Sequence, residues 1–331
     1  MFSLAFALHC ASAETGRTYE KGSPKHSRVW GFPFSRSPQR QNLRMGTITI
    51  NEKGVFSMDV QQTADWINVL GDFCGMRDVP ALTRENLKKR YGWEQADVMV
   101  LFGGSILCGA EILAGAMREK AAKRFLIVGG EGHTTESLRQ KIHAEFPQIE
   151  TVGRSEAECF AAYLWEKWGL RPDALETQST NCGNNVTYCL RLLEEQGIRP
   201  ASILLSQDAS MQRRMDAGFR QACSSETILV NYAVYRAKVV KKEGSLVFAE
   251  EISGMWDLER YLSLLLGEIP RLTDDSNGYG PRGKGFIAHV DIPQEVREAY
   301  EGLCTQYGRL IRPANEAYSS ENAEKRIHPA L

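Results

Sequence analysis

A run of small and polar side chains, QSTNCGNN, occupies positions 178–185, directly before a segment with helical periodicity from Val186 to Gln196. The first backbone N–H groups of a helix have no partner within it, and the helix dipole makes that end positive. A helix start can therefore bind a carboxylate or a phosphate. The pattern also fits an N-cap followed by a polar surface loop. The candidate ligand-binding residues here are Gln178, Ser179, Thr180, Asn181 and Asn185.

Glycine and polar residues follow three other apolar runs, at positions 97–102, 124–128 and 201–206. If these runs are parallel strands, their carboxyl ends meet at one edge of a sheet, where ligands of α/β proteins bind. QSTNCGNN would then form one wall of the same cleft. The candidate residues at these turns are Gly103, Gly104, Gly129, Gly130, Gly132, Gln207 and Asp208.

Several titratable side chains lie in or near these turns. His133 could act as a general base or contact a ligand, although a histidine beside a helix start also serves as a cap. Glu131, Glu156 and Asp208 are candidate acids, and their spacing assigns no role to any of them. The pair Arg213-Arg214 could hold an anion, or it could be a solvated helix turn.

The segment Gly130-Glu131-Gly132 resembles the start of a dinucleotide-binding fingerprint after a strand. Glu150, 20 residues after Gly130, could stand for the acid that binds the ribose. However, Thr135 occupies the place of the third glycine. The missing glycine argues against a conventional NAD site.

Short apolar runs alternate with helical patterns over the central part of the chain. Strands are expected at 97–102, 124–128, 148–152, around 175, 201–206 and 227–234, and helices at 108–120, 136–145, 155–168, 186–196 and 211–222. This alternation predicts an α/β fold, a parallel sheet covered by helices on both faces.

The periodicity changes after residue 254. An amphipathic helix is expected from Met255 to Ile269, ending at Pro270, and another from Gln294 to Tyr307. Between them lies a glycine-rich segment, 274–283, which contains Tyr279 and Arg282. It could approach a ligand or form a plain surface turn. It lacks the alternating acids of a calcium loop, so no metal site is expected.

Composition narrows the functional classes. The chain has 331 residues, 43% of them hydrophobic and 24% charged, and a net charge of -1, which is typical of a soluble globular protein and favours no nucleic-acid or membrane-surface partner. The most apolar window, 96–117, contains Asp97 and Glu111, so no stable membrane span is expected. Eight cysteines show neither CxxC pairs nor metal-ligand spacing, which fits a reducing, cytoplasmic compartment.

The first 45 residues differ from the remainder, with seven Lys/Arg against two acidic residues. A short apolar run, 2–10, suggests a secretory signal, but no basic residue precedes it. The Arg- and Ser-containing stretch 16–44 would suit an organellar transit peptide, and the leader could also associate with a membrane. The favoured interpretation is a disordered or wrongly assigned leader, with the true start at Met45 or Met58.

Six sequence blocks in one order resemble YdcF-like members of the ElyC/SanA/YdcF family, a domain of unknown function. The similarity extends from about Val60 to Ala299. The blocks are 127–135, which includes Thr134, 151–157, 178–185, 207–214, 259–272 and 274–283.

The resemblance implies a Rossmann-like three-layer α/β/α sandwich with an accessory helical part. It also implies binding of S-adenosylmethionine, although the family's reaction is not settled. One departure is Asn184, where the family usually has Glu. An amide does not titrate, so it could not replace a catalytic carboxylate.

Three functional hypotheses follow. The first is a protein that binds a nucleoside-type small molecule, such as S-adenosylmethionine, with Tyr279 near the sulfonium; its reaction is not established, and methyl transfer is one candidate. The second is a hydrolase or transferase of phosphate or pyrophosphate esters, with Arg213-Arg214 holding the anion and His133, Glu131 or Asp208 as base. The third is a ligand-binding module without chemistry.

The expected organisation has five parts. They are a leader, 1–57, an N-terminal helical segment, 58–95, a Rossmann-like ligand-binding core, 96–235, a C-terminal helical accessory part, 236–308, and a disordered tail, 309–331.

Overall fold

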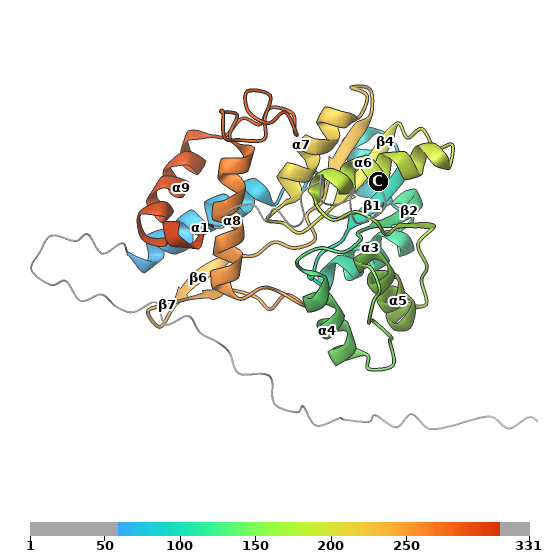
Figure 1. Cartoon of the computed structure of the whole chain (residues 1–331), viewed down its shortest axis with the longest axis horizontal. Coiled ribbons are helices and arrows are strands. Elements are labelled where there is room, and N and C mark those ends of the chain that lie inside the picture. The colour runs from blue at the N-terminus through green and yellow to red at the C-terminus, as the bar shows by residue number, and fades with distance from the viewer. Residues whose placement is uncertain (1–58, 312–331) are drawn as a thin grey trace, which may run out of the picture. The chain divides into compact units, whose positions relative to one another are not determined.

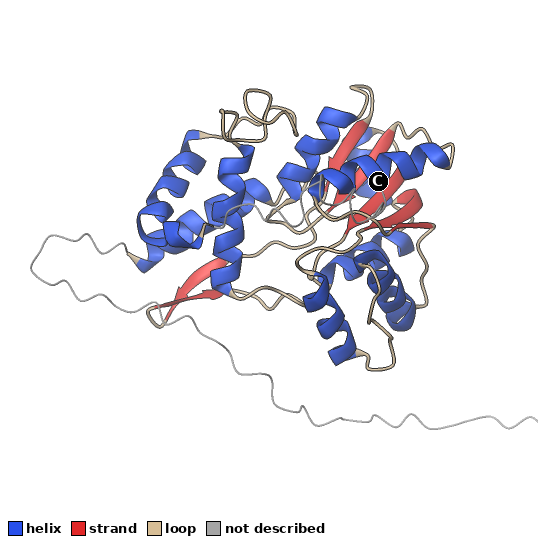
Figure 2. Ribbon diagram, viewed as in Figure 1, coloured by secondary structure: helices blue, strands red, loops and turns tan. Residues whose placement is uncertain are grey.

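The computed structural model describes residues 59–311, so the leader 1–57 and most of the expected tail lie outside the described residues. Its centre is a five-stranded, all-parallel sheet in the order β3-β2-β1-β4-β5 (Figures 1 and 2). The strands are β1 (Ala96–Phe102), β2 (Ala122–Val128), β3 (Ala174–Glu176), β4 (Ser202–Ser206) and β5 (Ile228–Asn231). The predicted Rossmann-like α/β fold is confirmed.

The central strands consist of apolar residues because helices cover both faces of the sheet. Along β1, Met99 and Leu101 pack into one hydrophobic core, whereas Val98, Val100 and Phe102 pack into a second core on the opposite face. The first core contains residues of α3 (Cys108–Arg118), α4 (Thr135–Glu145) and α5 (Glu156–Trp168). The second contains residues of α6 (Cys182–Glu195) and α7 (Gln212–Ala222), so three layers result.

Two sequence expectations about these elements are wrong. Residues 148–152 form a loop between α4 and α5, and the strand that pairs with β2 on that side of the sheet is β3. Helix α6 begins at Cys182, four positions before the expected start, because the side chain of Asn181 accepts the N–H of Asn184 and caps the helix there.

The remaining elements join both ends of the described chain. Helix α1 (Val60–Cys74) contacts α8 (Leu258–Leu272), α9 (Gln294–Tyr307) and a hairpin of β6 (Val239–Lys242) and β7 (Ser245–Phe248). This hairpin was not predicted from the sequence. A short helix, α2 (Arg84–Tyr91), follows α1, and a 3-10 turn, Gly308–Leu310, follows α9 within the expected tail.

Helix α8 continues past Pro270, where it was expected to end. Proline removes one donor from the last turn, but Ile269 and Leu272 on either side are both buried in the core. Tertiary packing therefore retains the turn. Among residues 59–311, no helix is long and apolar enough to cross a membrane.

Candidate functional site

The loops that follow the strands meet at the carboxyl edge of the sheet. The chain runs from β1 to β2 and β3 in one direction and then crosses to β4 on the other side of β1. Ligands of open α/β sheets bind at such a switch point. The structure has a cavity there, lined by Leu101, Phe102, Gly103, Gly104, Ile106, Gly109, Phe160, Gln207, Asp208 and Val234.

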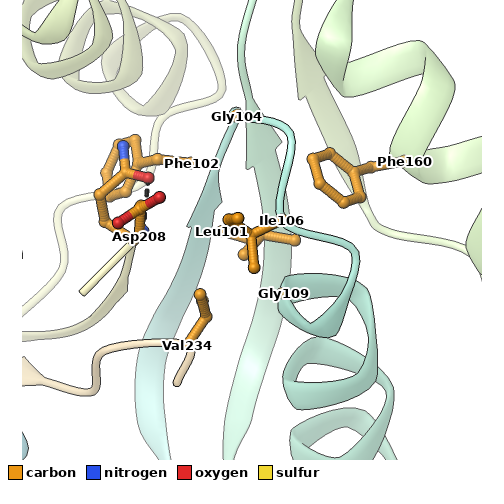
Figure 3. A pocket seen from close by; sticks show the side chains of 10 residues that line it. Leu101, Phe102, Gly104, Ile106, Gly109, Phe160, Asp208 and Val234 are labelled. Atoms are coloured by element: carbon orange, nitrogen blue, oxygen red, sulfur yellow. Dashed lines mark hydrogen bonds between the residues drawn. The ribbon is translucent and has the colours of Figure 1, made fainter. Parts of the chain in front are cut away.

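The cavity is narrow. Asp208 lies on one side and Phe160 of α5 on the other, with Leu101 and Ile106 between them (Figure 3). Its volume is about 10 Å³, which is room for about one water molecule. A ligand larger than this needs the surrounding loops to move.

The loop from β1 to α3, of which Gly104 and Ile106 line the cavity, carries several backbone donors. Within the described residues, no acceptor pairs with the N–H groups of Gly104, Ser105, Ile106 and Leu107. The last three of these residues are between 0% and 5% exposed. Buried N–H groups are rarely left without a partner, and consecutive ones at a helix start bind carboxylates and phosphates.

A second, independent donor belongs to another residue that lines the cavity. Gln207, which follows β4, is 1% exposed, and its Nε2 has no hydrogen-bond partner among the described residues. Its Oε1 accepts the N–H of Asp208 at 2.6 Å, which orients the amide. Within residues 59–311, the neighbouring Ser206 Oγ is also buried without a partner. An unsatisfied buried amide costs stability, so it indicates a place where a ligand group or water is accepted.

Glu156 lies against Gly103, which lines this cavity. It is the first residue of α5, and its N–H donates to the carbonyl of Gly130. Its carboxylate lies over the turns after β1 and β2, so close that a Cβ on Gly103 would overlap Glu156 Oε2. The Cα of Gly129 would also lie 3.1 Å from that Cβ. Glycine is therefore required at 103, because any side chain there would overlap the Glu156 carboxylate that packs against these turns.

Two threonine hydroxyl groups hold the Glu156 carboxylate. Thr134 Oγ1 donates to Oε1 at 2.8 Å and Thr135 Oγ1 at 3.0 Å. Thr134 is the N-cap residue of α4, yet its hydroxyl does not cap that helix. Burial raises the pKa of Glu156, and the two hydroxyl groups oppose part of that rise. A carboxylate held in this way can accept ligand hydroxyl groups or a proton.

The QSTNCGNN stretch is mainly an ordered turn and helix cap. The N–H groups of Gln178 and Ser179 both donate to Glu176 Oε1, at 2.6 and 3.0 Å, while Ser179 Oγ accepts the N–H of Gly130 at 3.1 Å. Ser179 thus fastens the turn after β2 to the turn after β3. The stretch supports the wall of the cleft, but none of its residues lines the described cavity.

Asn184 belongs to the cap. It is 7% exposed, and its Oδ1 accepts Thr180 Oγ1 at 3.1 Å and Asn181 Nδ2 at 2.9 Å. Asn185 lies in the same first turn, with its N–H bonded to the Asn181 carbonyl. Asn184, at the position where the resembling family usually has Glu, is therefore the third residue of helix α6. Glu also suits this position, because its side chain can bond back to the start of a helix.

Asp208 lines the cavity, but other groups of the protein already occupy its carboxylate. Oδ1 accepts the N–H and hydroxyl of Ser210 and the hydroxyl of Tyr235, at 2.9, 2.7 and 2.7 Å. Oδ2 accepts Trp256 Nε1 at 2.9 Å. These four donors fit a structural acceptor better than a general base.

The other two candidate bases lie at the surface. Glu131 is 63% exposed at its side chain and pairs with Arg139 at 3.3 Å. His133 is exposed on the loop before α4, next to Gly132, whose N–H donates to Thr135. Neither residue lines the cavity.

The arginine pair is tied to neighbouring helices. Arg214 forms a two-point ion pair with Glu268 of α8, with N–O distances of 2.6 and 3.0 Å. Arg213 Nε donates to the Phe73 carbonyl, and its guanidinium lies 4.0 Å from the centre of the Phe73 ring. These contacts join the core to α1 and α8, which weakens the hypothesis that the pair holds a ligand anion.

The glycine-rich loop is also occupied by its own contacts. The ring of Tyr279 packs edge-on against Phe286, with Lys284 Nζ 5.1 Å from its centre. Arg282 is 77% exposed, and its N–H donates to Asp274. No residue of 273–291 lines the cavity at the switch point.

This loop predicts a pH dependence. His289 Nδ1 lies 2.7 Å from Asp274 and Nε2 3.0 Å from Asp291, and Arg282 lies 3.9 Å from Asp274. The bonds to Asp274 and then Asp291 raise the pKa of His289 above its usual value of about 6.5. This contribution to stability is full below the unfolded pKa and is lost as the pH rises through the folded one.

We therefore expect His289→Gln to increase hydrogen exchange in residues 274–291 at pH 6 and to change it little at pH 9. The comparison is made by mass spectrometry on wild type and variant. An equal effect of the substitution at both pH values would mean that the charge of His289 does not hold the loop.

Among residues 59–311, no cluster of three or more His, Cys, Asp or Glu side chains could hold a metal ion, and the seven cysteines there are free thiols. The sequence matches no family model.

Three features of this region escaped the sequence analysis. They are the loop donors at 105–107, the carboxylate of Glu176 and the contacts of Lys141 with the loop. Of these three, only the loop donors had a signal in the sequence, which was the short loop and helix start directly after Gly103-Gly104.

Proposed function

We propose that this protein binds a nucleoside-type small molecule, S-adenosylmethionine foremost, in the cleft between the ends of β1, β2 and β4. One observation carries the proposal. The β1–α3 loop has four consecutive N–H groups, at 104–107, with no acceptor among the described residues, and two of these residues, Gly104 and Ile106, line the cavity at the switch point together with Gln207, whose side-chain Nε2 also lacks a partner there. Donors left unpaired in this way suit an anionic or carbonyl oxygen of a ligand.

The residues fit both polar ends of such a ligand. The N–H groups of the β1–α3 loop suit the carboxylate of the methionine part. Glu156, at the other edge of Gly103, is an acceptor that suits the ribose hydroxyl groups. Buried carboxylates also favour a neighbouring cation such as the sulfonium. The resemblance to S-adenosylmethionine-binding proteins supports the same choice.

Bound S-adenosylmethionine would supply a methyl group for transfer. The chain's own contribution would be to bind and orient the ligand and to shield it from water. The phosphoester hypothesis is weaker, since Arg214 and Asp208 are engaged by Glu268 and by four donors, respectively. A phosphate could still use the loop donors, so nucleotides belong in the test.

We expect S-adenosylmethionine and S-adenosylhomocysteine to raise the melting temperature of the full chain. A ligand that binds only the native state stabilises it by about 2.7 kcal/mol at 100 times its Kd. The assay is a thermal-shift titration with ATP, a sugar phosphate and adenosine in parallel. A shift with a phosphate compound alone would favour the phosphoester hypothesis, and no shift with any compound would contradict nucleoside binding.

A further inference from the structure

The segment Ser253–Trp256, here called the strap, lies directly against the β1–α3 loop. The Ser253 carbonyl accepts the N–H of Cys108 at 3.2 Å. Gly254 has φ +73°, and a Cβ at this position would lie 2.7 Å from the backbone nitrogen of Leu107. The strap precedes α8, and Figure 1 shows the orange chain before α8 extending towards α4. The strap therefore covers part of the β1–α3 loop, whose N–H groups are the proposed anion-binding donors.

Two side chains, Lys141 and Trp256, fasten the strap in addition to the bond between Ser253 and Cys108. Lys141 Nζ of α4 donates to the Gly254 carbonyl at 2.7 Å and to the Ser105 carbonyl at 2.9 Å, so one ammonium group joins strap and loop. At the other end, Trp256 Nε1 donates to Asp208 at 2.9 Å, and Lys141 Nζ lies 4.9 Å from the Trp256 ring centre.

The acceptors of Lys141 are neutral oxygens, and burial lowers its pKa, a shift that Asp208 opposes. A half-buried ammonium group without a carboxylate partner among the described residues binds less strongly than a buried ion pair does. The strap is therefore held by a few hydrogen bonds that can break without unfolding the sheet.

We propose that the strap is a lid over the switch-point cleft, which opens as a local unit by releasing Lys141 and Trp256. The closed cavity, about 10 Å³, is far smaller than the several hundred Å³ of a small-molecule pocket, so entry of a ligand requires the surrounding loops to move. The strap does not line the cavity itself, but it is bonded to the β1–α3 loop, which does. The identity of the ligand rests on the proposed function, whereas the opening itself can be measured without any ligand.

Cys108 reports on the opening. It is the first residue of α3, it is 8% exposed, and its N–H is the group that bonds to Ser253. Its Sγ lies 3.6 Å from the Val234 carbonyl, and burial raises the pKa of the thiol to about 12. Cys189, on α6 at the other face of the sheet and 0% exposed, reports global unfolding instead.

The test compares Gly254→Ala with Gly244→Ala. Both glycines have nearly the same φ, +73° and +75°, but a Cβ at 244 meets nothing within 4 Å. Labelling by iodoacetamide is followed at each cysteine by mass spectrometry on the full chain. We expect Gly254→Ala to speed labelling of Cys108 about tenfold, with Cys189 unchanged, and Gly244→Ala to leave both rates as in wild type.

Lys141→Met provides a second variant should Gly254→Ala fold poorly, and the same rise at Cys108 is expected. Unchanged labelling of Cys108 in both variants, or an equal rise at Cys108 and Cys189, would overturn the lid. Saturating S-adenosylmethionine should slow labelling of Cys108 in wild type. If the variants behave as expected but this ligand does not slow labelling, the result supports the opening of the strap and contradicts S-adenosylmethionine as the ligand.

Discussion

Replacing Glu156 with glutamine is expected to stabilise the fold and to weaken ligand binding at the same time. Burial raises the pKa of this carboxyl, so the folded protein binds its proton more tightly than the unfolded chain does. The resulting stability is full at low pH and is lost as the pH rises through the folded pKa. At neutral and higher pH a neutral amide of the same shape removes the cost of the buried charge.

The binding effect has the opposite sign. A hydrogen bond between a ligand hydroxyl and a charged acceptor contributes about 1.5–3 kcal/mol, so the Kd should rise about ten- to a hundredfold. The measurements are melting temperature from pH 5 to 8 and calorimetric titration of S-adenosylmethionine. The gain in melting temperature should widen with pH.

Glu158→Gln is the matched control, two residues along the same helix. Glu158 accepts the N–H and hydroxyl of Ser155, and these bonds lower its pKa, so its stabilising contribution is present at neutral pH and is lost in acid. This variant should therefore lose stability at pH 7 and retain its affinity. A Glu156→Gln protein that melts lower than wild type at pH 8, or binds equally well, would contradict the assigned role.

Breaking the buried ion pair between Arg214 and Glu268 is expected to be the most destabilising single change. The side chains are 14% and 4% exposed, so Arg214→Met removes both hydrogen bonds of the pair from a buried carboxylate and leaves it only Arg271, 3.8 Å away, as a cation. Loss of one partner of a buried pair costs about 3–5 kcal/mol, whereas the double change Arg214→Met with Glu268→Leu should recover most of that loss. Urea unfolding measures all three proteins.

The control is Arg191→Met, which breaks an exposed pair with Glu195 at 3.8 Å and should cost no more than about 1 kcal/mol. The double variant also separates the two ligand hypotheses. If Arg214 only joins α7 to α8, ligand affinity is retained in the refolded double variant. A large loss of affinity there would return Arg214 to the binding site.

The sheet could be predicted from the sequence because its strands are buried on both faces and therefore appear as continuous apolar runs. The failed strand at 148–152 shows the limit of this signal. Ile149 and Thr151 are buried and Val152 is 82% exposed, an alternation that imitates a strand. Whether such a segment pairs depends on where the folded chain places it relative to a strand edge, which the local sequence does not encode.

The candidate site was predictable in part for the same reason. Glycines and polar residues after strands had to gather at one edge, and Glu156, Gly103 and Gln207 do meet there. Which of them are free for a ligand depends on partners distant in sequence. Trp256 occupies Asp208 and Glu268 occupies Arg214, and only the folded chain shows these pairings.

Hydrogen exchange of the β1–α3 loop with and without S-adenosylmethionine tests the central claim most directly. Peptides that contain residues 104–107 should become protected on binding, because the ligand supplies the acceptors that these N–H groups lack within the described chain. Peptides from 147–153, which line a separate surface groove, should not change. Binding without protection at 104–107, or protection only in the groove, would contradict a ligand site at the switch point.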